Sequence, residues 1–396
     1  MTTISADIAI AGGGLSGALI AWRLKQKRPD LKTVVVERGD SLGGNHTWSF
    51  HETDLPADIA PWFEPLVVYS WPRQHIRFPK LDRTLQTGYR SITSERLHEV
   101  IAPTLGEGLV ANAEISSVDK SGIQLKDGRF IQARAVIDAR GQRRTGALTI
   151  GFQKFAGQVL KFKKPHGLDA PIIMDATVPQ TDGYRFVYVL PFTADTALVE
   201  DTYYADGAAY DPGTLAGEIH AYCERQGWEI DAVLREEDGL LPIAMAGDIE
   251  AHLAGGAEGV GLAGLGAGLF HPLTGYSLPD AARLAEKIAD ADDVSGDALY
   301  HLCRDHAITT WNRRGFYRML SRFLFDAAEP RNRYLVMRRF YKLNRGLIER
   351  FYAGVSTMPD KMRVLTGKPP VGFMKAVRCV DEAGWLNRLM KAEGQV

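Results

Sequence analysis

The hydrophobic pattern of the first 37 residues is that of a strand, a helix and a second strand. Residues 7–11 (Asp-Ile-Ala-Ile-Ala) form a short apolar run typical of a buried parallel strand, and residues 33–37 form another. Between them, residues 18–27 are mostly helix formers whose apolar positions have helical spacing. This order predicts a β-α-β unit, in which a helix connects two parallel strands.

The pattern changes further along the chain. Residues 110–141 alternate short strands with turn signals, whereas residues 151–241 contain longer β-prone runs, such as residues 184–190. A helix is expected at about residues 277–291, and the last hundred residues have a mostly helical pattern.

These elements predict an α/β fold with three parts. A Rossmann-type nucleotide-binding domain is expected from residues 1–150 and 242–300. It would be interrupted by an antiparallel sheet at residues 151–241 that holds the substrate, and residues 301–396 would form a helical C-terminal region. The length of 396 residues suits two or three domains.

The composition argues against several classes of protein. The 47 Lys and Arg are balanced by 48 Asp and Glu, whereas a nucleic-acid-binding protein would show a strong basic excess. Cys223, Cys303 and Cys379 are far apart and form no CxxC pair, so neither a disulfide framework nor a metal site is predicted. No signal peptide and no run of 18 apolar residues is visible, so any contact with a membrane would be at its surface.

A glycine-rich sequence lies directly after the first predicted strand and opens the helix. It reads Gly12-Gly13-Gly14-Leu-Ser-Gly17, a GxGxxG motif. Gly12 permits a tight turn, Gly14 lets the backbone approach a pyrophosphate, and Gly17 lets helix and strand pack closely. Glu37 ends the second strand, where an acid can accept hydrogen bonds from an adenosine ribose. Together these features predict a dinucleotide site at the start of the helix.

NAD and FAD both bind to this type of loop, and two later segments favour FAD. Gly43-Gly44 resembles the extended first motif of flavoproteins. Residues 135–141, which end at Gly141, resemble their second short FAD motif, where the chain returns beneath the cofactor.

The end of the nucleotide-binding domain resembles flavoproteins of the p-hydroxybenzoate-hydroxylase-like group. Gly264 and Gly275 match the late flavin motif of that group, although Leu265 stands where the motif normally carries Asp. Arg96 occupies a position from which that group often sends an arginine to the pyrophosphate. The resemblance implies the fold of the group and FAD as the cofactor.

Several longer segments resemble a more specific family. They are residues 43–50 (GGNHTWSF), 171–177 (PIIMDAT), 183–188 (GYRFVY), 198–202 (LVEDT), 268–279 (GLFHPLTGYSLP) and 350–354 (RFYAG). Together they resemble the bacterial lycopene β-cyclase family of FAD-dependent carotenoid cyclases, from residue 7 to about residue 370. The resemblance implies that lycopene and related acyclic carotenes are closed into β-rings, giving β-carotene via γ-carotene, without net oxidation.

The implied reaction needs an acid, a base, and negative charge or π density near a transient cation. A carboxyl group in an apolar tunnel has a raised pKa, which makes it a better proton donor near neutral pH. Glu200 lies in a β-prone apolar run and aligns with the catalytic acid of the family's motif, although a strand-edge ion pair with an arginine is its alternative role. Asp201 is the second catalytic candidate, but alternation along a strand places it on the opposite face, where a structural role is expected.

The resemblance further implies that reduced FAD stabilises the cation or relays the proton, with NAD(P)H as the reductant. His46 and His271 fall within family motifs, and either could contact the flavin, although a single histidine in a turn is more often a structural hydrogen-bonding residue. Aromatic residues such as Trp48 and Tyr188 could line a tunnel for the polyene and offer π faces to a cation. Core packing is the expected role of most of the aromatic residues.

Two segments of the C-terminal region are candidates for contact with a membrane, because lycopene dissolves in bilayers. The apolar residues of 316–324 lie on one helical face, and Arg314, Arg318 and Arg322 lie opposite. Residues 338–352 are also basic and aromatic. A basic amphipathic helix suits an anionic membrane surface, so a peripheral position at the cytoplasmic face of the cell membrane is expected. The alternative is that the apolar stripe faces the core and the arginines are solvated.

Two other functions fit the same features. A flavin-dependent monooxygenase or reductase of a large isoprenoid would share the fold and the cofactor, but would change the oxidation state of its substrate. An inert flavin-binding or scaffold protein of a carotenoid assembly would turn nothing over. The oxidation state of the product separates the first alternative from a cyclase.

Overall fold

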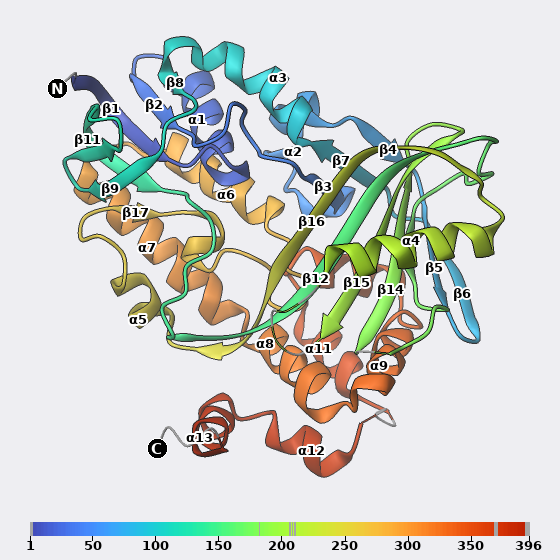
Figure 1. Ribbon diagram of the computed structural model, residues 1–396. Coiled ribbons are helices and arrows are strands. Elements are labelled where there is room, and N and C mark those ends of the chain that lie inside the picture. The colour runs from blue at the N-terminus through green and yellow to red at the C-terminus, as the bar shows by residue number, and fades with distance from the viewer. Residues whose placement is uncertain are drawn as a thin grey trace.

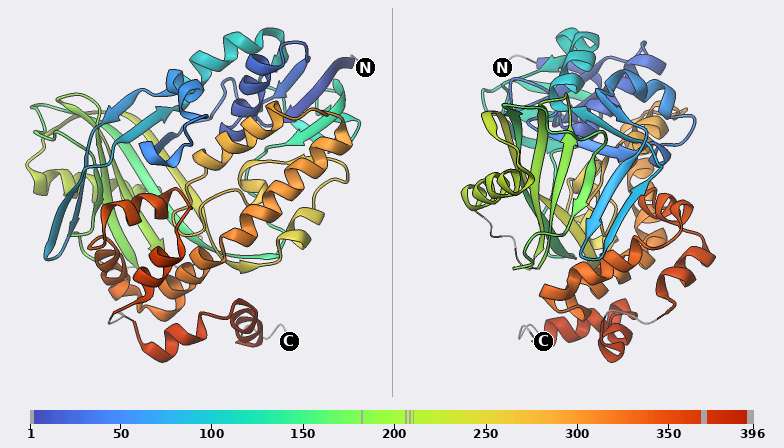
Figure 2. Two further views of the ribbon diagram at one scale, coloured as in Figure 1. Left: turned by 180° about the vertical axis from the view of Figure 1, so that it is seen from behind. Right: turned by 90° about the vertical axis from the view of Figure 1, so that its right-hand side faces the viewer.

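The computed structural model describes residues 3–392 except 182, 206, 208, 210 and 368–370. Within these residues the chain forms two seven-stranded sheets, a three-stranded sheet and a helical C-terminal region (Figure 1). One large sheet lies at the end of the molecule that contains the N-terminus. The second lies beside it, and the last helices lie below the second sheet (Figure 2).

The first large sheet contains the predicted β-α-β unit. Its order is β8-β2-β1-β11-β10-β9, and β17 pairs with β11. The strands are β1 (Thr3–Ala11), β2 (Thr33–Val36), β8 (Leu109–Val110), β9 (Ile115–Asp119), β10 (Gly122–Leu125), β11 (Phe130–Asp138) and β17 (Gly261–Leu262). Because β1 is parallel to both β2 and β11, the carboxyl ends of these strands meet at one edge. A dinucleotide binds at this edge in such folds.

Three helices pack together against this sheet: α1 (Leu15–Lys27), α3 (Ser94–Leu105) and α6 (Leu278–Ala289). The apolar face of α1 is fully buried, including Leu19, Ile20 and Leu24. The late helix α6 contacts α1 although it follows more than 250 positions later, so the nucleotide-binding part is assembled from two separate segments of the chain. The short helix α5 (Ile249–Ala254) precedes β17.

The second large sheet has the order β16-β12-β15-β14-β13-β5-β6. Its strands are β5 (Gln74–Phe78), β6 (Leu81–Leu85), β12 (Leu148–Phe162), β13 (Ile172–Asp175), β14 (Tyr184–Pro191), β15 (Thr196–Ala205) and β16 (Ile230–Gly247). Neighbouring strands are antiparallel except β13 and β5, which are parallel. The domain boundaries expected at residues 151 and 241 do not enclose this sheet, because a hairpin from the N-terminal segment completes its edge and β16 continues to Gly247.

A helix that the sequence pattern did not predict covers one face of the second sheet. It is α4 (Pro212–Gln226), and the side chain of Asp211 caps it by accepting hydrogen bonds from the backbone N–H groups of Gly213 and Thr214. Its buried residues Ile219 and Tyr222 pack against valines of β14 and β15. The opposite face of the sheet is therefore the one left for a ligand.

The small sheet joins β3 (Thr47–His51), β7 (Tyr89–Thr93) and β4 (Tyr69–Trp71) between the two large sheets. The short helix α2 (Ala60–Phe63) follows β3. The C-terminal region is helical, as predicted. It contains α7 (Gly296–Arg313), α8 (Gly315–Arg322), α9 (Arg333–Phe340), α10 (Arg345–Tyr352), α11 (Met358–Leu365), α12 (Phe373–Arg378) and α13 (Glu382–Ala392).

Arg314, which precedes α8, and Arg318 and Arg322 within it are buried. The prediction that these arginines face solvent or lipid is therefore wrong. The guanidinium of Arg314 makes two hydrogen bonds to Asp280, at 2.5 and 2.8 Å. Arg318 and Arg322 both pair with Glu382 of α13, at 3.1 and 3.2 Å. A guanidinium is tolerated away from water when it is paired in this way. The local pattern could not show that a distant helix supplies the partner.

Candidate active site

One face of the second large sheet carries side chains that the strand register places side by side. Gly157 of β12 lies opposite Glu200 of β15 and opposite Glu237 of β16, and Tyr188 of β14 lies opposite Glu200. The neighbouring row contains Phe186, Thr202, Phe155 and Gly239. Residues in register on adjacent strands point to the same face, so both rows face away from α4.

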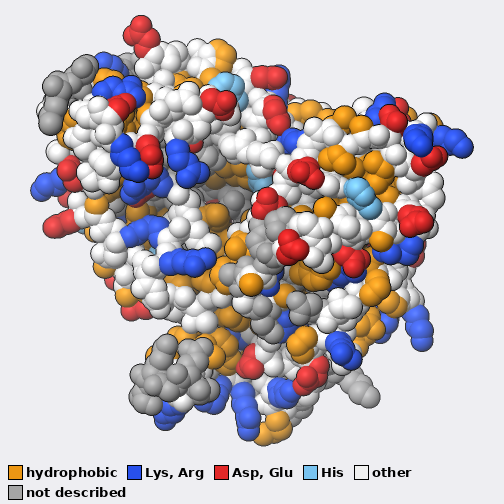
Figure 3. Space-filling model, in the orientation of Figure 1, with side chains coloured by type: hydrophobic (Ala, Val, Ile, Leu, Met, Phe, Trp, Pro, Cys, Tyr) orange, Lys and Arg blue, Asp and Glu red, His pale blue; other side chains and the backbone are white. Residues whose placement is uncertain are grey.

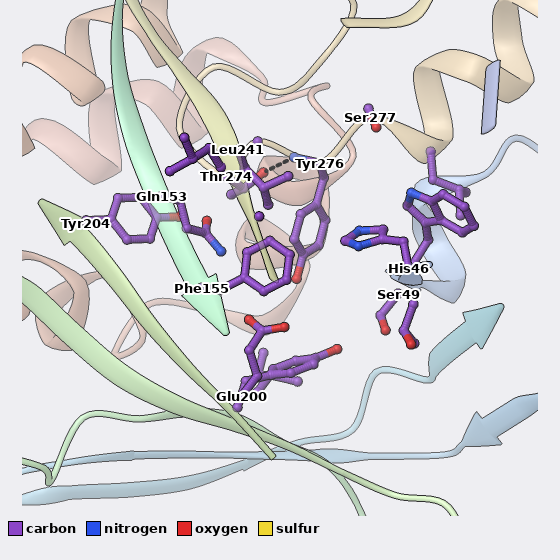
Figure 4. A pocket seen from close by; sticks show the side chains of 18 of the residues that line it. His46, Ser49, Gln153, Phe155, Glu200, Tyr204, Leu241, Thr274, Tyr276 and Ser277 are labelled. Atoms are coloured by element: carbon purple, nitrogen blue, oxygen red, sulfur yellow. Dashed lines mark hydrogen bonds between the residues drawn. The ribbon is translucent and has the colours of Figure 1, made fainter. Parts of the chain in front are cut away.

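A cavity of about 300 Å³ lies over this face. Glu200, Phe155 and Tyr188 contribute from the sheet, and His46 and Tyr276 close it from the other side. Figure 4 shows the Glu200 carboxyl group and the rings of Phe155, Tyr276 and His46 directed toward the same space. This cavity combines the inward-facing carboxyl group of Glu200 with a largely aromatic wall, and Asp238 also contributes to its lining.

Glu200 is held in the cavity by its neighbour on the same strand. The Thr202 hydroxyl donates a hydrogen bond of 2.6 Å to Oε1 of Glu200. The pKa of Glu200 is raised to about 8, mainly by burial and secondly by the negative charge of Glu237. The carboxyl group is therefore mostly protonated at neutral pH and can donate a proton.

Asp201 points to the other face of the sheet and is not part of this cavity. Its Oδ1 accepts a hydrogen bond of 2.9 Å from Nε of Arg185, which also pairs with Glu218 of α4 at 2.7 Å. Burial raises the pKa of Asp201 to about 6, although Arg185 opposes the shift. The structure therefore separates the two catalytic candidates and places Asp201 in a structural ion pair.

Sequence reasoning missed Glu237, a second carboxyl group on the cavity side of the sheet. Its side chain is buried, and Oε2 accepts hydrogen bonds from the Thr47 hydroxyl at 3.0 Å and from Arg235 at 2.8 Å. Burial raises the pKa of Glu237 to about 7, although Arg235 opposes the shift. The run Glu236-Glu237-Asp238 was a possible signal, but only the strand register shows which of the three carboxylates faces inward.

Tyrosine hydroxyl groups line the cavity beside Glu200. Tyr188 donates a hydrogen bond of 3.0 Å to Tyr89, whose hydroxyl lies 2.9 Å from that of Tyr276. Burial raises the pKa of each of these hydroxyls well above its ordinary value, so they stay neutral. Trp48, the other aromatic residue singled out from the sequence, also lines the cavity, as does Phe186.

The two candidate histidines have different surroundings. Burial, and next the charge of Arg235, lower the pKa of His46 to about 4, so this cavity-lining imidazole is neutral at neutral pH. His271 lies outside the cavity lining, with Nε2 3.1 Å from the carbonyl oxygen of Phe351. Its Nδ1 accepts hydrogen bonds from the backbone N–H groups of Leu273 and Thr274, which indicates a structural role.

A second cavity, of about 530 Å³, lies at the carboxyl edge of the first large sheet. Its lining includes Gly12, Gly14, Glu37, Gly141 and Gly264, five of the predicted cofactor residues. The space-filling view shows a hollow between the nucleotide-binding part and the second sheet (Figure 3).

Two other glycines of the motif shape this cavity from behind. The backbone N–H of Gly13 donates a hydrogen bond of 2.7 Å to Oε2 of Glu37, which fixes the carboxylate against the loop. A Cβ atom on Gly17 would lie 2.0 Å from the carbonyl oxygen of Gly12, so only glycine lets α1 pack this closely.

The residues of the second cavity fit a dinucleotide. Gly14, Gly44 and Gly141 line it, and a Cβ atom on any of them would meet no other atom of the described chain within 4 Å. The absent side chains thus leave space for a ligand. The Ser16 hydroxyl is buried there without a hydrogen-bond partner in the described part of the chain, and so is available to a ligand.

Arg96, expected near the pyrophosphate, lies elsewhere. Its Nε donates a hydrogen bond of 2.9 Å to the carbonyl oxygen of Pro65, and it is not among the described residues lining the cavity. Thr93 caps α3, and the helix then directs Arg96 toward the outer surface. Arg38 and Arg140 line the cavity instead and can offer positive charge to phosphates.

Gly275 lines the first cavity, with a φ of +71° and Leu241 close to where a Cβ would lie. Trp48, Leu265 and Ser277 line both cavities, so the Glu200 cavity and the dinucleotide cavity adjoin. The apolar Leu265 thus stands at their junction. No cluster of three or more potential metal-ligating side chains occurs among the described residues.

Comparison with known proteins identifies close relatives. A family model described as lycopene cyclase protein matches residues 7–378. Lycopene beta-cyclase of Pseudescherichia vulneris is 48% identical over 94% of this chain and 96% of its own length. Lycopene beta-cyclase of Pantoea ananas is 44% identical over 94% of this chain and 97% of its own length.

Solved structures of low sequence identity share the fold. A geranylgeranyl bacteriochlorophyll reductase-like protein from Thermoplasma acidophilum has a TM-score of 0.63 at 13% identity, over 95% of this chain and 98% of its own. A p-nitrophenol 4-monooxygenase from Pseudomonas putida has a TM-score of 0.56 at 15% identity, over 92% of this chain and 97% of its own. The fold is that of the p-hydroxybenzoate-hydroxylase-like flavoproteins, as the sequence motifs predicted.

The raised pKa of Glu200 predicts a pH-dependent change in stability. An unfolded chain loses the Glu200 proton near pH 4.5, and the folded chain loses it near pH 8. Between these values the unfolded chain is stabilised by ionisation and the folded chain is not, so the free energy of unfolding falls as the pH rises. Glu200→Gln should therefore stabilise the chain little at pH 5, but by an amount on the order of a few kcal/mol at pH 8. Thermal unfolding at both pH values measures the difference. The exposed Glu236→Gln is the control, and an equal gain at both pH values would contradict the assigned burial.

The open space beside Gly14 predicts a variant that loses the dinucleotide without losing the fold. The backbone at this position is extended, and an added Cβ would meet no other described atom within 4 Å, so a valine side chain would enter the cavity. Gly14→Val should keep the melting temperature of the ligand-free chain and weaken FAD binding by about ten-fold or more. Flavin fluorescence titration measures the affinity. Gly217→Val, at an equally open glycine of α4, is the control, and equal affinity in the two variants would refute the site.

Proposed function

The chain belongs to the lycopene cyclase family, and on this basis we propose that it is a lycopene β-cyclase whose acid–base chemistry takes place in the Glu200 cavity. The observation that carries the proposal is the Glu200 carboxyl group, which faces a cavity walled by aromatic rings and adjoining the dinucleotide cavity, and whose pKa is raised to about 8 by burial. Acyclic carotenes, with lycopene first among them, are the proposed substrates, and β-carotene formed via γ-carotene is the proposed product.

The proposed reaction is a proton transfer followed by ring closure. Glu200 donates its proton to C2 of the terminal C1=C2 double bond, which leaves a cation at C1. The C5=C6 double bond attacks C1 and closes the six-membered ring, and loss of the C6 proton gives the β-end group. One proton is gained and one is lost, so no electrons are transferred overall.

The wall of the cavity suits a cationic intermediate. Phe155, Tyr188 and Tyr276 can present π faces to the cation, and ionised Glu200 can stabilise it through its negative charge. The aromatic wall also excludes water, which would otherwise capture the cation as an alcohol. Thr202 holds Oε1 of Glu200 and so fixes the direction of the carboxyl group.

FAD is the proposed cofactor, held by the glycine loop, Ser16 and Glu37. When bound and reduced, it supplies negative charge next to the Glu200 cavity. NAD(P)H is the proposed reductant. The same fold also serves monooxygenases, and a flavin-dependent monooxygenase or reductase of a large isoprenoid is the alternative that product analysis must exclude.

A peripheral position at the cytoplasmic face of the cell membrane is also proposed, because the substrate dissolves in bilayers. Seven of the ten large hydrophobic side chains that are exposed in the described residues fall within residues 355–380, and we call this region the α11–α12 surface. They are Val355, Met358, Met362, Leu365, Met374, Val377 and Val380. The exposed Arg363, Lys375 and Arg378 lie among them and suit anionic headgroups. Hydrophobic and basic side chains occur together at the lower end of the molecule in Figure 3.

An apolar cavity of about 420 Å³ beneath this surface supports the proposal. Leu365, Val377 and Val380 line it from the α11–α12 surface, and Phe351 lines it from inside. The next residue, Tyr352, lines the Glu200 cavity. The apolar cavity thus offers a place for the polyene between the membrane side and the helix that also borders the Glu200 cavity. Among the described residues, no helix is both long and apolar enough to span a membrane.

Anaerobic incubation with lycopene in liposomes, FAD and NADPH tests the proposed function. The expected product has the mass of lycopene and carries β-rings, and reductant is needed only in catalytic amounts. Activity should fall as the pH rises through about 8, because Glu200 then loses its proton. Glu200→Gln should bind FAD normally and lose at least about 100-fold in rate, the usual contribution of a general acid.

Liquid chromatography with mass detection follows the pigments. A mass increase of two hydrogens would identify a reductase, and a product formed only with oxygen would identify a monooxygenase. Full activity in Glu200→Gln would remove Glu200 from the mechanism.

The membrane proposal predicts the effect of charges on the α11–α12 surface. The triple variant Met358→Glu, Met362→Glu and Met374→Glu should lose binding to liposomes that contain anionic lipid, because buried apolar area is replaced by repulsive charge. It should still cyclise lycopene in detergent micelles. Co-sedimentation measures binding.

The control is Val68→Glu, Val233→Glu and Leu234→Glu, which alters the other three exposed hydrophobic residues. Equal binding of the two triple variants would contradict the assignment of the surface.

A further inference from the structure

Glu237 lies next to Glu200 without touching the cavity, and the strand between them carries glycine. Gly157 is in register with both residues, so the two carboxylate side chains belong to one row across three strands. A Cβ atom on Gly157 would lie 3.5 Å from Cβ of Glu200 and 3.3 Å from Cγ of Glu237. The two side chains therefore flank the space that a side chain at 157 would occupy.

The surroundings of Glu237 leave one of its oxygens unsatisfied. Oε2 is held by Thr47 and Arg235, whereas Oε1 is buried and has no hydrogen-bond partner in the described part of the chain. The side chain of Glu237 is only 1% exposed. A buried carboxyl group is costly to ionise, and its negative charge disfavours a second negative charge in the same row of the sheet.

We propose that Glu237 is a positioning residue that acts through Glu200, and that its negative charge, on the far side of Gly157, keeps the catalytic proton on Glu200. The inference rests on the proposed function, because it concerns how the acid of that reaction keeps its proton. Two carboxyl groups in one row of the sheet, with only a glycine between them, are not readily ionised together, since each negative charge opposes the other.

Arg235 determines which of the two carboxyl groups is ionised first. Its guanidinium lies 2.8 Å from Oε2 of Glu237 and 3.1 Å from Glu95 of α3, so the positive charge is on the Glu237 side of the pair. Glu237 is thus the member that carries negative charge, and Glu200 is the member that keeps the proton and faces the cavity. When Glu200 has donated its proton, the same repulsion favours its return.

Other ionisable groups also surround the pair. They are Asp201 on the same strand, Asp238 next to Glu237 on β16, Tyr188 on β14, His46 before β3, Glu95 on α3 and Tyr276 from the opposite wall. The two tyrosines and His46 are neutral near pH 7, and Asp201 faces Arg185 on the other side of the sheet. Glu237 is therefore the carboxyl group whose removal should change the titration of Glu200 most.

Infrared titration of the holoenzyme tests the proposal directly. The carboxyl C=O band of Glu200 is identified by its loss in Glu200→Gln. In Glu237→Gln, which keeps the shape but removes the charge, this band should disappear at a pH lower by about one unit or more. The alkaline limb of kcat/KM should move by the same amount, so activity at pH 8 falls by about five-fold or more while activity at pH 6 is retained.

The chain offers a matched control on the same strand. Glu236 points to the other face, where its Oε1 accepts a hydrogen bond of 2.7 Å from Gln158, so Glu236→Gln should leave the band and the pH profile unchanged. Gly157→Ala is the second test, because its methyl group would contact Cγ of Glu237, Cβ of Glu200 and the Leu198 side chain, and a wider separation of the two glutamates should shift the band in the same direction. Glu237→Asp should restore most of the wild-type titration.

Each result bears on the proposal. An unchanged Glu200 titration in Glu237→Gln, or an equal shift in Glu236→Gln, would overturn it. If Glu237→Gln does not fold, an unchanged titration in Gly157→Ala overturns it instead. The infrared measurement does not require turnover, so a shifted band in a chain that forms no β-rings would refute the proposed function and leave the coupling of the two carboxyl groups standing.

Discussion

A carboxyl group kept out of water, yet close to a second carboxyl group, is the constraint on which the site depends. In water Glu200 would be ionised and could not protonate an alkene near neutral pH. Burial and the neighbouring charge of Glu237 reverse that preference. Both conditions come from the sheet, whose alternation directs Glu200 inward and whose register brings Glu237 beside it. Burying an acid destabilises the fold, and ionisable groups whose pKa is shifted in this way are concentrated at catalytic sites.

The rest of the molecule can be understood from this constraint. The opposite face of the sheet is closed by α4 and the Arg185–Asp201 ion pair, so one face remains for a ligand. The small sheet and the turn at His46 cover that face, and Trp48, Leu265 and Ser277 connect it to the dinucleotide cavity. The C-terminal helices are fixed to the body by buried pairs such as Arg314–Asp280. Residues 355–380 carry seven of the ten large apolar side chains that are exposed in the described residues, and their helices α11 and α12 lie at the lower end of the molecule (Figure 2).

Local sequence signals predicted those parts of the structure that depend on local geometry. The glycine loop and Glu37 could be recognised because a tight turn and a close helix require particular residues at fixed spacing. Glu200 could be placed on the apolar side of its strand by alternation. Long-range partners could not be read in the same way. The inward direction of Glu237 depends on the register of β12 with β16. The burial of Arg314 and Arg318 depends on their partners Asp280 and Glu382, which are distant in the sequence. The position of Arg96 depends on the orientation of α3.

The origin of the added proton tests the central claim most directly. If protonated Glu200 starts each ring closure, lycopene cyclised in D2O gains one deuterium at C2 of each new ring, because carboxyl protons exchange with solvent. The product would then be heavier by one mass unit per ring than the product formed in H2O. A cyclised product without deuterium would contradict the account, since the hydrogen would have come from a source that does not exchange.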